Sequence, residues 1–250
     1  MLTHVQSSKS SWDQKITKFD QHRRERFSFH QQPSFYDKSY FESGIKSQKS
    51  LYENYRWLPK LTRPLAKAIC RFANISDKDI VVDYGCARGY VVRALVENGM
   101  NAFGMDISEY AIENSDALIR KRLHLIQEDT LPVSFQKMGL PEVNWMIAKD
   151  VFEHIAPEKL FKTLCEAAEL GIKLYVLVPL GDSGKYRIPD YELDASHVIA
   201  EDEQWWSNMF TSANFKITNF RHHVDGIKEA ALNLHEKGNA QFLLQPEAKQ

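Results

Sequence analysis

Cysteine is scarce in this sequence, and the few cysteines are scattered. The 250 residues include only Cys70, Cys86 and Cys165, and no two of them form a C-x-x-C pair. This pattern excludes a disulfide framework, a zinc ribbon and a thioredoxin-type redox motif. An odd number of isolated cysteines is typical of a reducing compartment, so we expect a cytoplasmic protein.

Long apolar runs and an excess of one charge are also absent. No run of 18 consecutive apolar residues occurs, which predicts no membrane span, and MLTHVQSSKSSWDQ at the start lacks the apolar core of a signal peptide. The 32 Lys and Arg residues nearly balance 33 Asp and Glu residues, for a formal charge of -1. Proteins that coat nucleic acid usually carry a strong basic excess, so we expect no nucleic-acid partner.

Residues 1–50 differ in composition from the rest of the chain. They contain nine Lys and Arg and five Asp and Glu residues, a local charge of +4 (9 − 5), and their aromatic residues follow no helical or strand period. We predict a partly ordered N-terminal arm, or alternatively a lid over a pocket. The main domain is predicted over 51–245, followed by a short tail at 246–250.

Short β-branched runs alternate with helical stretches through most of the remaining chain. The predicted strands are 79–85, 101–106, 123–129, 143–150, 172–179, 215–222 and 239–245. The predicted helices are 90–99, 108–122, 151–171 and 201–213. Alternation at this spacing predicts an α/β fold, a doubly wound and mostly parallel seven-stranded sheet with helices on both faces.

The helical pattern of residues 51–73 precedes the first strand. Pro59 and Pro64 limit it to two short helices or to one helix that begins near Pro64. Within it, the segment 52–57 is aromatic and charged beyond what a core helix needs. The glycine-containing loop 181–187 is predicted to be a mobile cover that hydrogen-bonds a polar ligand.

Residues with ligand-binding chemistry stand at the ends of the predicted strands, where such a sheet binds its ligands. The first strand runs into Asp83-Tyr84-Gly85-Cys86-Ala87-Arg88-Gly89. This stretch matches neither the G-x-G-x-x-G fingerprint nor the phosphate-binding P-loop. Asp83, just before the turn, would repel a phosphate but suits a positively charged group such as an amine.

Two further carboxylates follow the next two strands. Asp106 stands 21 residues after Gly85 (106 − 85), the usual distance for a carboxylate that accepts hydrogen bonds from ribose hydroxyls. Asp129 ends the third predicted strand, where a carboxylate can accept from the exocyclic amine of a base. The strand ends therefore indicate a ribonucleoside that carries an amine and lacks phosphate.

The motifs VVDYGCARG, GMDIS, QEDTLP and AKDVFEHI, in this order, resemble the class I S-adenosylmethionine-dependent methyltransferases over residues 75–222. The first motif of that family typically reads D-x-G-x-G-x-G. Ala87 replaces the middle glycine, and we expect its methyl group to be accommodated by a negative φ. The resemblance implies S-adenosylmethionine as cofactor and a seven-stranded sheet whose last strand is antiparallel.

Matching positions imply which residues hold the methionine and ribose parts of the cofactor. Gly85, Cys86 and Gly89 would line the methionine part. Asp83 would serve its amino group, directly or through water. Asp106 would hold the ribose hydroxyls.

The same resemblance implies a binding site for the adenine and the sulfonium. Ile107 would pack on the adenine ring. Asp129, with Thr130 beside it, would accept from the adenine amine. Lys149 and Asp150 would form the floor near the sulfonium.

If the group that receives the methyl is a hydroxyl, a base must remove its proton, and histidine is the usual choice. His154, in DVFEHI, lies close to the expected sulfonium. His197 lies in a stretch, D-A-S-H-V…WW…NF, that is similar to family members that methylate sugars, which implies that this histidine faces the acceptor. Both are predicted catalytic residues, with His197 favoured.

No metal site is predicted. His222, His223 and Asp225 resemble a metal cluster only superficially, because no helix-spaced His/Glu pair accompanies them, and a solvated strand end is favoured. The predicted function is methylation of a hydroxyl on a small polar molecule or sugar precursor, in surface-glycan assembly. A nucleoside-binding scaffold without activity and a nucleic-acid or protein methyltransferase are the alternatives. The basic arm favours the latter, whereas the lack of an N/D-P-P-Y motif after the fourth strand disfavours it.

Overall fold

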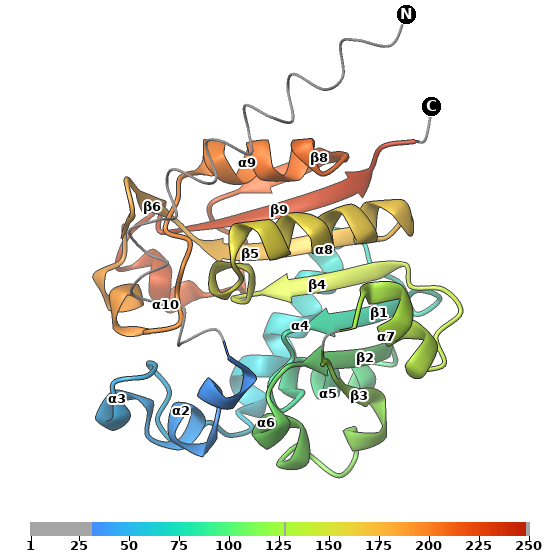
Figure 1. Cartoon of the computed structure of the whole chain (residues 1–250), viewed down its shortest axis with the longest axis horizontal. Helices are drawn as coiled ribbons and strands as arrows, with labels where there is room; N and C mark the ends of the chain where they lie inside the picture. The colour runs from blue at the N-terminus through green and yellow to red at the C-terminus, as the bar shows by residue number, and fades with distance from the viewer. Residues whose placement is uncertain (1–31, 128, 249–250) are drawn as a thin grey trace, which may run out of the picture.

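The computed structural model describes residues 32–127 and 129–248, and within them seven strands form one sheet (Figure 1). The strands are β1 (Ile80–Tyr84), β2 (Asn101–Asp106), β3 (Leu123–Leu125), β4 (Trp145–Lys149), β5 (Lys173–Pro179), β8 (Phe215–Arg221) and β9 (Asn239–Pro246). Their order is β3-β2-β1-β4-β5-β9-β8, and β9 runs antiparallel to both of its neighbours. The predicted doubly wound, mostly parallel sheet is therefore confirmed.

Helices cover both faces of this sheet, and each face has its own hydrophobic core. Strand β5 shows the reason: Leu174 and Val176 pack into one core, whereas Tyr175 and Leu177 pack into the other, and all four are fully buried. A strand buried on both faces needs a continuous apolar run. The first face is covered by α7 (Leu131–Lys137), α8 (Pro157–Glu169) and α9 (Glu203–Ser212), and the second by α4 (Pro59–Ala73) and α5 (Tyr90–Glu97).

The helix before β1 corrects a prediction from the sequence. Helix α4 begins at Pro59 and continues through Pro64, instead of breaking or beginning there. Pro59 occupies the first helical position, where a missing N–H costs nothing. Pro64 has no backbone N–H, so the carbonyl of Lys60, four residues earlier, receives no helical hydrogen bond. Both residues lie on the exposed face of the helix. Water can satisfy that carbonyl, so the helix tolerates the proline.

Two other predicted helices are shorter than the apolar pattern indicated. The stretch 108–122 forms only α6 (Glu109–Glu113) and a 3₁₀ turn, η2 (Arg120–Arg122). Ser108 caps the start of α6, but Asp116 accepts from the backbone N–H of Leu118 and so favours a turn over a helix. The stretch 151–171 forms a 3₁₀ turn, η3 (Phe152–His154), before α8, because Pro157 disfavours helical conformation at the residue before it.

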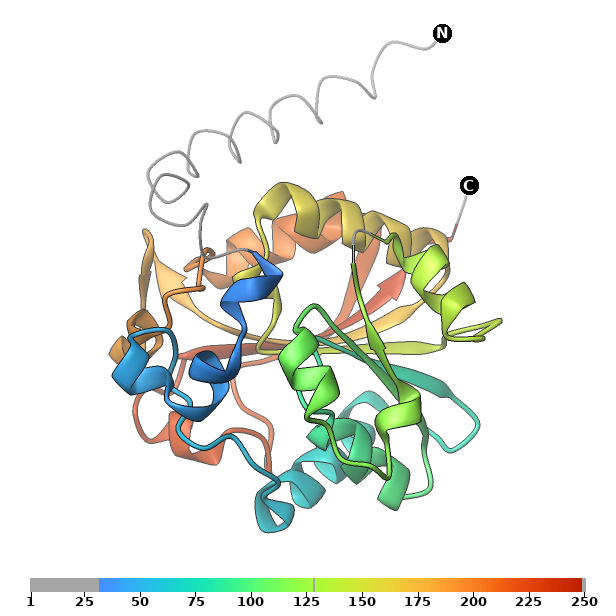
Figure 2. The ribbon, with the colours of Figure 1, turned by 60° about the horizontal axis from the view of Figure 1, so that its bottom comes forward.

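The described part of the predicted arm packs against the domain. It forms η1 (Pro33–Phe35), α2 (Lys38–Glu42) and α3 (Gly44–Ser47). Figure 2 shows these segments, in blue, beside the green α6 region and the orange loops that follow β5. Arg88 donates to Glu42 at 2.5 Å and to the carbonyl of Tyr55 at 2.7 Å, which ties the arm to the loop after β1. Residues 1–31 of the predicted arm lie outside the described residues.

The loop after β5 forms a small hairpin of β6 (Gly181–Asp182) and β7 (Lys185–Tyr186). Arg187 holds it in place through paired hydrogen bonds of 2.8–2.9 Å to Asp182 and Glu203. Its guanidinium is therefore engaged in the fold. Among the described residues, no helix is long and apolar enough to cross a membrane.

Candidate active site

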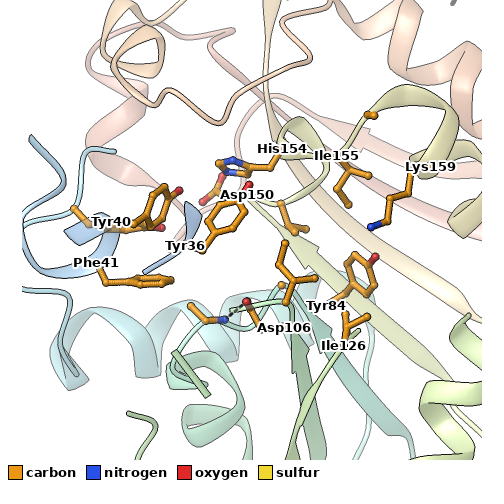
Figure 3. Close-up of a pocket in the computed structure, with 16 residues that line it drawn as sticks. Tyr36, Tyr40, Phe41, Tyr84, Asp106, Ile126, Asp150, His154, Ile155 and Lys159 are labelled. Carbon is orange, nitrogen blue, oxygen red and sulfur yellow. Dashed lines mark hydrogen bonds between the residues drawn. The ribbon is translucent and has the colours of Figure 1, made fainter. Parts of the chain in front are cut away.

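A cavity of about 130 Å³ lies at the carboxyl ends of β1, β2 and β4 (Figure 3). Five residues predicted from the sequence line it: Gly85, Asp106, Ile107, Asp150 and His154. They come from the loops after three neighbouring strands, so the topology brings together side chains up to 69 residues apart (154 − 85). This is the edge of the sheet at which a doubly wound fold binds its ligands.

The loop after β1 turns through glycines with positive φ, 76° at Gly85 and 75° at Gly89. The N–H groups of Gly85 and Cys86 donate to the carbonyl of Met105 at 2.8 and 3.1 Å, which fixes the loop against β2. A Cβ at Gly85 would lie 2.3 Å from the side chain of Val151, so only glycine fits. Burial raises the pKa of the Cys86 thiol and so favours its neutral form. This residue contributes to the loop through its backbone hydrogen bond and the packing of its side chain.

Ala87 lies between these glycines and corrects a second prediction. Its φ is +48°, so the expected negative φ is wrong. The left-handed conformation costs an L-residue roughly 1–2 kcal/mol. The methyl group packs against the aromatic cluster of the arm around Tyr40 and Phe41, and this contact offsets part of that cost.

Asp106 ends β2 and faces the cavity with a buried carboxylate. Its Oδ2 accepts from the N–H of Ala87 at 2.7 Å, the bond drawn in Figure 3, and its Oδ1 accepts from the N–H of Ser108 at 2.8 Å. Burial raises the pKa of Asp106, and these N–H groups partly offset that effect. Each oxygen keeps lone-pair capacity for a ligand hydroxyl. This geometry suits the predicted contact with a ribose.

Asp83 lies on β1 next to the glycine loop and is 4% exposed. Burial raises its pKa to about 7, and the nearby Asp106 adds to this effect while Lys149 opposes it. It does not line the cavity itself, which suits a contact through water with an amino group. A cationic amine at that position would stabilise the ionised carboxylate.

Lys149 and Asp150 form an ion pair with a third partner that the sequence did not indicate. Lys149 donates to Asp150 Oδ2 at 2.5 Å, and the ammonium of Lys228 lies 2.5 Å from Oδ1. Burial alone would raise the pKa of Asp150, but the two ammonium groups outweigh it and hold that pKa below its usual value. Lys228 precedes α10 (Glu229–Leu232) in a stretch that reads as surface, so nothing in the sequence pointed to it.

A second cavity, of about 260 Å³, contains the predicted Asp129 and Thr130. It shares four lining residues with the first: Tyr84, Ile107, Ile126 and Lys159. The carboxylate of Asp129 accepts from Lys137 Nζ at 2.7 and 2.9 Å. Lys137 is nearly half exposed and can give way, so the contact between Asp129 and the adenine amine stays a prediction.

The opposite end of the first cavity is formed by His154 and the residues that orient it. In Figure 3 its ring lies beside Tyr36 and Asp150, away from Tyr84 and Lys159. Its Nδ1 lies 2.8 Å from the hydroxyl of Ser196, and that hydroxyl donates to Asp194 at 2.5 Å. The Ser196 proton is thereby committed, so His154 Nδ1 must be the donor to Ser196 Oγ. Its Nε2 is left with a free lone pair.

His197, which the sequence favoured as the base, lies behind His154. The two ring centroids are 4.5 Å apart, and His197 is not among the residues that line the cavity. Its Nδ1 donates to the carbonyl of Tyr191 at 2.8 Å. Burial lowers its pKa to about 3, with His154 adding to the effect, and burial also lowers the pKa of His154.

Aromatic residues of the arm and of the segment directly after it line the cavity, which agrees with the alternative prediction of a lid, although no motif singled out the individual residues. Tyr36, Tyr40, Phe41 and Tyr52 all line it. The hydroxyl of Tyr40 donates to Asp194 at 2.9 Å, and Ser108 donates to the carbonyl of Tyr36 at 2.5 Å. The one available signal was the density of aromatic residues between 35 and 41.

Carboxyl groups outnumber ammonium groups around the cavity. Five carboxyl groups lie within or beside it, those of Asp83, Asp106, Asp150, Glu153 and Asp194. Three ammonium groups lie near them, those of Lys149, Lys228 and Lys159. Such an excess favours a ligand that carries positive charge, as a sulfonium with an amino group does.

Comparison with known proteins agrees with this geometry. The family model described as "Methyltransferase domain" matches residues 56–220, and no curated protein matches. A SAM-dependent methyltransferase from Archaeoglobus fulgidus is 17% identical, with a TM-score of 0.54 over 75% of this chain and 96% of that one. Two larger structures each have 13% identity and a TM-score of 0.52 over 75% of this chain and 54% of theirs. They are a mitomycin 7-O-methyltransferase and an SAH-bound methyltransferase of calicheamicin biosynthesis.

At such identities the solved structures show a shared fold, while the family model covers about two-thirds of the chain. Its span includes the glycine loop, Asp106 and the β4 loop with His154. The cavity lies at the carboxyl ends of the strands, where a doubly wound fold binds its ligands. The chain belongs to the methyltransferase-domain family and is a class I S-adenosylmethionine-dependent methyltransferase.

Proposed function

We propose that the methyl acceptor is a hydroxyl group of a small polar molecule. The observation that carries this proposal is that His154 lines the same cavity as Asp106 and the glycine loop. An imidazole nitrogen with a free lone pair therefore lies at one end of the cavity, and the ribose-binding carboxylate lies near its floor. Phenol groups of Tyr36 and Tyr40 add polar atoms at the histidine end.

A small acceptor is favoured over a polymer because the arm closes this side of the cavity. A nucleic acid or protein substrate needs an open groove, whereas here Tyr36, Tyr40 and Tyr52 line the cavity at the strand ends. The three free cysteines fit a cytoplasmic enzyme. The likeness of the His197 stretch to sugar methyltransferases supports a sugar precursor, as used in surface-glycan assembly.

In the proposed reaction each part of the cavity has one task. Asp106 and the glycine loop hold the ribose and methionine parts of the cofactor, and Asp83 stabilises its amino group. The methyl carbon forms a bond to the acceptor oxygen and breaks its bond to sulfur, whose electron pair returns to a neutral thioether. Alignment of the two reactants contributes about 7–11 kcal/mol. His154, which lines the cavity, is the catalytic residue at the hydroxyl, which must lose its proton, and His197 behind it acts as a positioning residue.

The test is turnover with a panel of acceptors. Purified protein is supplied with S-adenosylmethionine and, in turn, with hydroxylated small molecules including nucleotide sugars, with amines, with an RNA duplex and with a basic peptide. We expect S-adenosylhomocysteine release with a hydroxylated small molecule and a product heavier by one methylene. Turnover confined to the RNA or the peptide would contradict the proposal.

A further inference from the structure

Three side chains with metal-binding atoms converge behind the wall of the cavity. Glu153 and His154 belong to the 3₁₀ turn after β4, and His197 belongs to the loop that follows η4 (Pro189–Leu193). One ligand atom from each residue lies within 4.8 Å of the other two. Backbone bonds from Val198 and Ile199 to the carbonyl of Glu153, at 2.8 and 3.2 Å, hold the two segments together.

The hydrogen bonds around the two rings leave the same nitrogen of each histidine available. His154 Nδ1 donates to Ser196, and His197 Nδ1 donates to the carbonyl of Tyr191, because neither partner has a proton to give in return. Both rings are therefore held in the tautomer whose Nε2 carries a lone pair. Metal-binding histidines commonly have their second nitrogen fixed in this way by a neighbouring acceptor.

The carboxylate of Glu153 supplies the third lone pair. Glu153 is 1% exposed, and among the described residues its Oε2 has no hydrogen-bond partner. A buried acceptor without a donor is costly, by about 1–3 kcal/mol or more for a charged group. Two imidazole nitrogens and one carboxyl oxygen thus lie together in a largely buried space.

We propose that Glu153, His154 and His197 bind a divalent transition-metal ion at the acceptor end of the cavity. Two imidazoles and one carboxylate are a common donor set for Zn²⁺ and its neighbours in the first transition row. Ligand atoms about 2.1 Å from a tetrahedral ion lie about 3.4 Å apart. The distances between the three ligand atoms, which are at most 4.8 Å, must therefore shorten by at most about 1.4 Å. Side-chain rotation can supply that movement.

The proposed ion has a role in methyl transfer that rests on the proposed function. Because His154 lines the cavity, an ion held by this set lies at its wall, and an acceptor hydroxyl can take an open coordination position. Coordination lowers the pKa of a bound hydroxyl, so its proton passes to water before the oxygen attacks the methyl group. The two histidines would then act as ligands, and neither would need to accept the proton itself.

The test measures binding of Co²⁺, a coloured stand-in for Zn²⁺, to chelator-treated protein without cofactor or acceptor. We expect one equivalent to bind, with visible absorption bands of a low-coordinate ion. His197→Ala and Glu153→Gln should each weaken this binding at least tenfold, while circular dichroism shows that both variants are folded. Glu153→Gln keeps the side-chain volume and so guards against a result caused by unfolding.

The chain offers a matched control in its other cluster of possible ligands. His223, Asp225 and Glu229 lie on the surface, and the two acids are mostly exposed. His223→Ala should leave the tight Co²⁺ site unchanged. The proposal would be overturned if no stoichiometric Co²⁺ spectrum appeared. It would also be overturned if the spectrum were lost in His223→Ala but kept in His197→Ala. Either result would mean that a shared proton, and not a metal ion, links Glu153 to the two rings. Because no substrate is present, Co²⁺ binding fails or succeeds independently of the acceptor panel.

Discussion

The two ends of the cavity are built in different ways. At the cofactor end, Gly85, Asp106 and Ile107 each follow directly from a strand of the parallel sheet, and backbone turns set their positions. At the acceptor end, the arm, the β4 loop and the loop after η4 contribute side chains from residues 36 to 228. The first end follows from the ends of neighbouring strands, whereas the second depends on contacts between segments that are far apart in the sequence.

The largest effect should come from a change at the acceptor end. His154→Ala removes the imidazole that lines the cavity, and it should lower kcat by about 10²-fold or more, since acid–base or metal assistance commonly contributes 10²–10⁴. The Kd for S-adenosylmethionine should change by less than about threefold. Steady-state kinetics and calorimetry measure the two quantities. An equal loss in both would mean that the ends are not separate.

The converse change affects the cofactor end. Asp106→Ala removes the buried acceptor for ribose hydroxyls and should weaken S-adenosylmethionine binding by about 1–3 kcal/mol, or roughly 5- to 150-fold. Calorimetry on this variant and on Asp190→Ala, which removes an exposed carboxylate, provides the comparison. Unchanged affinity in Asp106→Ala would remove the ribose assignment.

A smaller effect should appear in the pH dependence of stability. The folded pKa of Asp83 is about 7, above its value of 3.8 in a model compound, and Lys149, Asp106, Cys86 and Tyr55 are the titratable groups that face it. Its stabilising contribution is therefore complete below about pH 4 and is lost as the pH rises through 7. The slope from this one group is at most about 1.4 kcal/mol per pH unit.

Urea unfolding at pH 5 and pH 7.5, without cofactor, measures this dependence. The free energy of unfolding of the wild type should fall between the two values. Asp83→Asn should remove most of that fall, because asparagine carries no proton to lose. The same slope in both proteins would assign the pH dependence to other groups.

Much of the sheet could be predicted because each strand has a local signal. All seven predicted runs form strands, since a continuous apolar run between turn residues allows few other structures. The errors in helices arose where one local rule competed with another. Pro64 was compatible with a helix because its face is exposed, and Asp116 ended a helix that the apolar spacing alone would continue.

The residues of the candidate site also differ in whether a local sequence signal indicates them. The positions of Gly85, Asp106 and Asp150 at the strand ends could be predicted because a turn of fixed length after each strand places them. Their contacts with the cofactor stay predictions. Tyr36, Tyr40 and Lys228 could not be predicted, because they act through contacts with residues far away in the chain. The hydrogen bond between Tyr40 and Asp194 joins positions 154 residues apart, and no period or motif specifies such a pair.

The arm touches both ends of the cavity at once. Ser108, next to Asp106, donates to the carbonyl of Tyr36, and Tyr40 donates to Asp194, whose other partner is the Ser196 hydroxyl beside His154. Any movement of this short segment would therefore disturb both ends of the cavity together. A single stretch of chain thus couples the two binding regions, because neither can lose its contact with the segment without a change at the other.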